Sequence, residues 1–103
     1  EAIGSALAGV EAAPALELAP DATIVLYNLG IGLMHLGRNA EAVERLERAA
    51  VLAPDVETYL SLTTAYGRNG QQTRAMASFI RARELDPNHP QVAAIGRMMA
   101  GQR

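Results

Sequence analysis

Apolar and small residues recur along the chain at a fixed spacing of 33 residues, once from Leu29 to Pro54 and again from Leu62 to Pro87. A repeat of this length is typical of supersecondary units that bury their apolar faces by stacking on their neighbours. The matched positions are Leu29, Gly30, Leu33, Gly37, Ala42, Leu46, Ala49, Leu52 and Pro54, followed by Leu62, Thr63, Tyr66, Gly70, Ala75, Phe79, Ala82, Leu85 and Pro87.

Turn signals divide each repeat into two helices. Pro54-Asp55 and Pro87-Asn88 separate helices, because proline cannot continue a helix and an Asp or Asn side chain can accept the first free amides of the next one. Gly37 and Gly70 mark the turn inside each repeat, since helices commonly stop at a glycine in the left-handed conformation. We expect helices over 1–12, 22–36, 39–53, 56–69, 72–86 and 90–101, with a turn over 14–19.

The same pattern sets the organisation of the chain, which we expect to be a single all-α array of antiparallel helix-turn-helix repeats. Residues 23–55 form repeat 1 and residues 56–88 form repeat 2. Residues 1–22 are interpreted as a partial repeat, the second helix of a preceding unit, and residues 89–103 as a capping helix or the first helix of a further repeat.

Small residues indicate where two helices approach closely. We expect Gly30 to face Ala42 and Ala49, because helices that cross at short range need side chains of hydrogen or methyl size. We also expect Asn39 to cap the helix that begins after Gly37. The larger side chains expected beside the close contact are Leu29, Leu33 and Leu46.

These positions resemble the tetratricopeptide repeat. Residues 23–55 match through Asn28-Leu29-Gly30, Leu33, Gly37, Glu41-Ala42, Leu46, Ala49, Leu52 and Pro54, and residues 56–88 match through Tyr59, Leu62, Tyr66, Gly70, Ala75, Phe79, Ala82 and Pro87. Three positions, Leu26, Leu33 and Thr63, depart from the residues common in the family. The resemblance implies a right-handed α-solenoid in which the first helices of successive units line a concave groove, where a peptide or helix binds.

The candidate binding residues lie on the faces of the first helices that do not meet their partner helix. One interpretation is a partly apolar groove for an amphipathic helix or extended peptide, with Tyr27 as its anchor and arginines at one end. The other is that the N-terminal segment, or repeats beyond this chain, cover Ile24, Ile31 and Met34. The candidates are Ile24, Tyr27, Asn28, Ile31, Met34, His35, Glu57, Leu60, Ser61, Thr64, Arg68, Ala93 and Arg97.

Composition excludes several partners and kinds of chemistry. The net charge of −2 and the lack of a basic cluster argue against nucleic-acid binding, which needs cations to displace phosphate counterions. The chain lacks cysteine, which excludes disulfides and thiolate catalysis, and no apolar stretch is long enough for membrane insertion. We expect a bacterial and cytoplasmic protein, with the periplasm as the alternative location.

Catalytic chemistry is not indicated by the polar residues. His35 and His89 belong to no spacing that holds a metal or activates a nucleophile. The Gly30-Ile31-Gly32 run lies inside a predicted helix, so it is not a dinucleotide-binding loop. We therefore expect no enzymatic activity, no cofactor and no metal.

Three functions remain open. The first is a protein-interaction scaffold that binds a peptide or amphipathic helix in the groove. The second is an accessory region of a larger bacterial enzyme, such as a glycosyl- or sulfotransferase, or of a secretion or pilus assembly component. The third is self-association through the open ends of the array. The chain has no lysine, which argues against the carboxylate clamp of chaperone-binding members of the resembled family.

Overall fold

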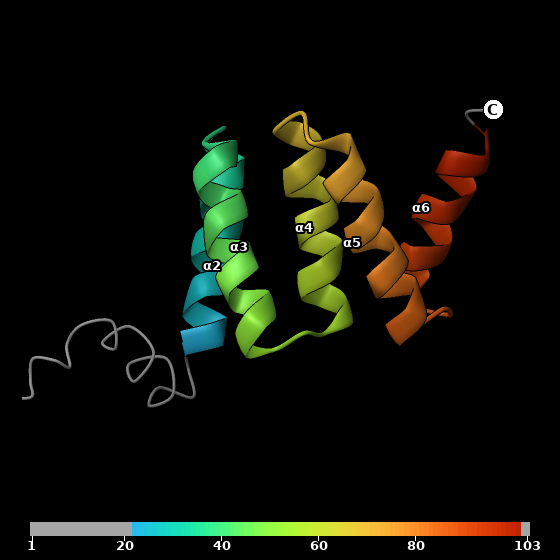
Figure 1. Cartoon of the computed structure of the whole chain (residues 1–103), viewed down its shortest axis with the longest axis horizontal. Coiled ribbons are helices and arrows are strands. Elements are labelled where there is room, and N and C mark those ends of the chain that lie inside the picture. Colours follow the sequence, from blue (N-terminus) through green and yellow to red (C-terminus); the bar gives the residue numbers. More distant parts are fainter. Residues whose placement is uncertain (1–21, 102–103) are drawn as a thin grey trace, which may run out of the picture.

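The computed structural model describes residues 22–101, which contain five α-helices and no strand (Figure 1). The all-α class and all five helices predicted within this range are confirmed, each to within one residue at either end. The helix expected over 1–12 and the turn over 14–19 lie outside the described residues. The helices are α2 (Ala22–His35), α3 (Asn39–Leu52), α4 (Val56–Arg68), α5 (Gln72–Leu85) and α6 (Pro90–Gly101).

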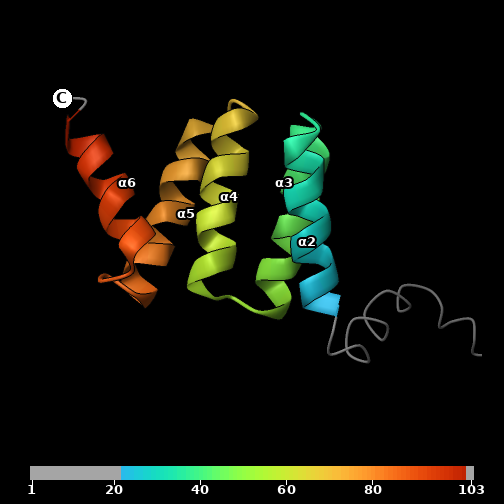
Figure 2. The same ribbon diagram turned by 180° about the vertical axis from the view of Figure 1, so that it is seen from behind.

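The helices form a repeat-like arrangement of hairpins. α2 packs against α3, α4 packs against α5, and α3 also contacts α4, so the two hairpins lie side by side. Figure 2 shows α2, α4 and α6 on the near side of the molecule, with α3 and α5 behind them. The first helices of successive units therefore share one face.

Glycine turns and a side-chain cap define the helix boundaries. Gly37 and Gly70 adopt φ values of 82° and 78°, a conformation that strains residues with a Cβ, as predicted. Asp55 caps α4, because its Oδ1 accepts a hydrogen bond of 2.9 Å from the amide of Thr58. The prediction that Asn39 caps α3 is wrong: Arg38 holds that position without a side-chain hydrogen bond.

The interface between α3 and α4 contains two long-range polar contacts. The Asn39 side chain, instead of capping α3, donates through Nδ2 to the carbonyl oxygen of Arg68 at 3.4 Å. The Tyr66 hydroxyl donates to the Glu47 carboxylate. Burial raises the pKa of Tyr66 above its usual value, and the neighbouring Glu47 carboxylate raises this pKa further. These contacts lie beside the apolar cluster that α3 and α4 share.

The close contact between α2 and α3 is centred on Gly30. A Cβ placed on Gly30 would lie 2.6 Å from Cγ of Leu46 and 3.4 Å from the carbonyl oxygen of Ala42. Leu46, expected beside the contact, therefore fills the space directly opposite Gly30, and Ala42 faces Gly30 as predicted. Ala49 is fully buried on α3. The expectation that Leu29 fills the space beside this contact is wrong, because Leu29 is 44% exposed.

Alanine substitutions at the two glycines of α2 are expected to change stability in opposite directions. Gly30→Ala should lower the free energy of unfolding by about 1–3 kcal/mol through overpacking against Leu46. Gly32→Ala should raise it by up to about 1 kcal/mol, since no atom of residues 22–101 lies within 4 Å of its Cβ position and alanine favours the helix. Urea denaturation followed by circular dichroism measures both values, and shifts of the same sign would contradict this packing.

Candidate functional site

A groove of about 370 Å³ lies between the three first helices. Its walls combine apolar atoms with hydroxyl, amide and carboxylate groups, so it offers both contact surface and hydrogen-bonding partners to a ligand. The lining residues are Tyr27 and Met34 from α2, Glu57, Leu60, Ser61 and Thr64 from α4, and Gln91, Ala94 and Ile95 from α6.

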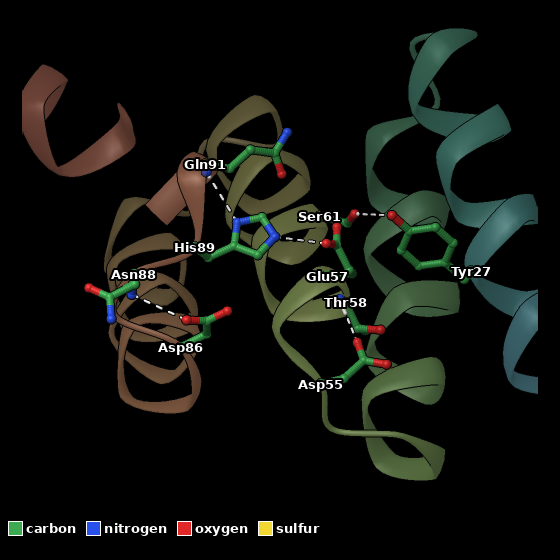
Figure 3. Close-up of polar contacts among 9 residues, drawn as sticks. All are labelled: Tyr27, Asp55, Glu57, Thr58, Ser61, Asp86, Asn88, His89 and Gln91. Carbon is green, nitrogen blue, oxygen red and sulfur yellow. Dashed lines mark hydrogen bonds and ion pairs between the residues drawn. The ribbon is translucent and has the colours of Figure 1, made fainter. Parts of the chain in front are cut away.

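A hydroxyl pair joins α2 and α4 along this groove (Figure 3). Ser61 Oγ donates to Tyr27 Oη at 3.2 Å. Each phenolic hydroxyl can both accept and donate, so the proton of Tyr27 remains available for a ligand carbonyl. Thr64, one turn further along α4, donates its hydroxyl to the Leu60 carbonyl at 3.4 Å, which leaves its oxygen lone pairs available as acceptors.

A histidine joins α4 to the start of α6. The backbone amide of Gln91 donates to His89 Nδ1 at 3.1 Å, and His89 Nε2 lies 2.8 Å from Glu57 Oε2 (Figure 3). Because Nδ1 accepts a hydrogen bond, this arrangement fits a neutral imidazole that donates from Nε2 to the carboxylate. His89 therefore caps α6 and connects it to the groove wall.

This capping role was missed by sequence reasoning. The Pro-Asn signal favoured Asn88 as the cap of the last helix, and this prediction is wrong. The amide of Asn88 instead donates to Asp86 Oδ1 at 3.2 Å within the turn. Histidine is an uncommon cap, and its second partner, Glu57, is 32 residues away along the chain, so only the folded arrangement shows its role.

The structure brings six of the thirteen predicted site residues together in the groove. Ile24 lies on a separate hollow of about 220 Å³, which Tyr27 and Glu57 also line. Asn28, Ile31, His35, Arg68 and Arg97 line neither space. The predicted residues in the groove are Tyr27, Met34, Glu57, Leu60, Ser61 and Thr64.

The apolar anchors expected for a ligand are mostly core residues. Met34 and Leu60 are buried and present only a small part of their surface to the groove. Ile31 packs against the same core cluster as Met34, while Ile24 is well exposed. The groove is therefore more polar than the sequence suggested, because packing within the two core clusters already uses most of the large apolar side chains.

The residues of α6 that line the groove differ from those predicted. Ala93 and Arg97 were expected to line it, but both are exposed outside the groove, and Gln91, Ala94 and Ile95 line it instead. Ala94 is the counterpart of Ser61 at the 33-residue offset, so the repeat spacing alone could have identified Ala94 as a groove residue. The rotation of a terminal helix depends on its packing, which here centres on Val92.

Within residues 22–101, no group of three or more His, Cys, Asp or Glu residues is arranged to hold a metal ion. None of the helices in this range combines the length and hydrophobicity needed to cross a membrane. Comparison with protein-family models and with curated proteins finds no match for the chain.

Proposed function

We propose that this chain is a non-catalytic protein-interaction module that binds a peptide in the groove between α2, α4 and α6. The observation that carries the proposal is that three helices from successive units contribute to one groove with exposed hydrogen-bonding groups beside apolar atoms. We further propose that the repeats are arranged as a right-handed α-solenoid of the tetratricopeptide type. The 33-residue spacing and the two packed hairpins support this architecture.

The groove chemistry favours an extended segment over a whole helix. An extended peptide presents unpaired backbone groups to the groove, whereas the backbone groups of a helix are already paired with one another. The backbone groups of a peptide find hydrogen-bonding partners in the hydroxyls of Tyr27 and Thr64 and in the side-chain amide of Gln91. Ala94 and Ile95 supply apolar contacts for one of its side chains.

The decisive substitutions compare two neighbouring alanines of α6. Ala94→Arg places a long side chain in the groove, whereas Ala93→Arg places the same side chain on an exposed position outside it. Peptides would first be selected from a displayed random library against the wild-type chain. We expect Ala94→Arg to weaken binding of a selected peptide at least about tenfold, or about 1.4 kcal/mol, and Ala93→Arg to leave it unchanged.

Two results would contradict the proposal. One is a selection that enriches no peptide for the wild-type chain. The other is equal binding by both variants after circular dichroism has shown that both are folded. Ile31→Glu is a poorer test than Ala94→Arg, because Ile31 packs against the core and the new carboxylate would destabilise the fold itself.

A further inference from the structure

The groove between α2, α4 and α6 carries charge of one sign. Among the described residues that line it, Glu57 is the only charged one. The smaller hollow of about 220 Å³ shares Tyr27 and Glu57 with the groove and adds a second carboxylate, Asp55. The arginines expected at one end of the groove, Arg68 and Arg97, line neither space. The charge that a ligand meets there is therefore negative.

Both carboxylates can accept further hydrogen bonds. The Glu57 side chain is 57% exposed, and its Oε2 lies 2.8 Å from His89 Nε2. Asp55 uses Oδ1 for the amide of Thr58. Because a carboxylate has two oxygens with about four lone-pair sites, each group keeps acceptor capacity for a ligand. Within residues 22–101, no arginine forms an ion pair with either carboxylate.

The start of α4 does not neutralise this charge. The N-terminus of a helix contributes a partial positive charge of about half an elementary unit, which is smaller than the charge of two carboxylates. Figure 3 shows Asp55 and Glu57 together at this end of α4, with Tyr27 of α2 nearby. The site therefore favours a cation over an anion.

Apolar surface lies beside the carboxylates. Ile24 is 60% exposed and lines the smaller hollow together with Tyr27. Lysine and arginine side chains bury their aliphatic stems on apolar surface while the charged head group stays near water. An aromatic ring such as that of Tyr27 also attracts cations through its face. The hollow thus combines an apolar wall, an aromatic residue and two carboxylates, which together suit a long basic side chain.

We propose that Glu57 determines the specificity of the groove for a peptide that carries a lysine or an arginine. This inference rests on the peptide-binding function proposed above and adds the chemical class of the peptide. The basic side chain extends from the groove into the smaller hollow, where its stem lies against Ile24 and its head group lies beside Glu57 and Asp55. A peptide carboxylate at the same place meets like charges, so the site discriminates against acidic peptides.

Parallel peptide selections on the full chain test this specificity. A displayed random library is selected against the wild type, Glu57→Arg and Glu44→Arg. Glu44 is exposed on α3 and lines neither space, so its substitution changes the net charge equally and leaves the groove intact. We expect the wild type and Glu44→Arg to enrich peptides with lysine or arginine at one shared position. Glu57→Arg should lose this preference or enrich aspartate or glutamate there.

Affinity measurements isolate the ion pair. Glu57→Gln keeps the side-chain length and an oxygen that can accept from His89, so it removes the charge alone. In fluorescence polarisation, it should weaken binding of a wild-type-selected peptide about fivefold, the upper range for an exposed ion pair. It should not affect the same peptide with glutamine at its basic position, and Glu44→Gln should affect neither. Added NaCl should weaken binding to the wild type more than to Glu57→Gln.

The outcomes distinguish this inference from the function on which it rests. Suppose that the enriched peptides lose binding to Ala94→Arg but share no basic position; the role of Glu57 is then overturned, and the peptide-binding function stands. Equal weakening of the basic and neutral peptides by Glu57→Gln would also overturn it, because Glu57 would then act on the structure of the groove. A library that enriches no peptide would contradict both proposals.

Discussion

Phe79→Ala is expected to lower the free energy of unfolding by about 3–5 kcal/mol and to release α6 from the rest of the protein. Phe79 is buried in a cluster with Leu60 of α4 and Val92 of α6, so one ring connects three helices. Its Cζ also lies 3.9 Å from the Cβ position of Gly96. Figures 1 and 2 show α6 leaning away from α5 toward its C-terminal end, which leaves this cluster as its main support.

The measurement is urea denaturation combined with amide hydrogen exchange of α6. Exchange in α6 should accelerate more than exchange in α2 and α3, because local opening of a terminal element needs less energy than global unfolding. Val51→Ala is the control, since Val51 lies on α3 and is 78% exposed. Unchanged protection of α6 in Phe79→Ala would show that other contacts hold this helix.

Leu46→Ala is expected to cost about 2–5 kcal/mol of stability. Leu46 is the largest side chain that is fully buried in the described residues. It packs into the space that Gly30 leaves open, so its removal creates a cavity between α2 and α3. Thermal and urea denaturation measure the loss, and Leu85→Ala on the exposed end of α5 serves as the control.

A double mutant separates this contact from general loss of packing. Gly30→Ala should cost stability in the wild-type background but little in the Leu46→Ala background, because the cavity accommodates the added methyl group. The interaction energy of this cycle should therefore be clearly different from zero. Additive effects of the two substitutions would mean that Gly30 and Leu46 do not share one space.

Binding and stability place different demands on the first helices. Met34 and Leu60 contribute to the core from the side of the groove, so changes there would affect folding as well as any bound peptide. Ser61, Thr64 and Ala94 offer surface to the groove with less involvement in the core. Substitutions at Ser61, Thr64 and Ala94 therefore test a binding function with the least effect on folding.

Helix boundaries in residues 22–101 could be predicted because their signals are local. Gly37 and Gly70 supply positive φ, and Pro54-Asp55 combines a residue that cannot continue a helix with a side chain that caps the next one. Each of these effects acts over a few residues, so these helix ends can be predicted without knowledge of the fold. The 33-residue spacing then indicated which helices are equivalent.

The positions of the side chains on those helices required the tertiary structure. The role of His89 depends on Glu57 of another helix, and Asn39 contacts α4 instead of its own helix end. Exposure also differs between equivalent positions, since Leu62 is buried by α3 while Leu29 has no corresponding helix within the described range. Periodicity assigns a residue to a helix face, but only the neighbouring helices decide whether that face is core, groove or open surface.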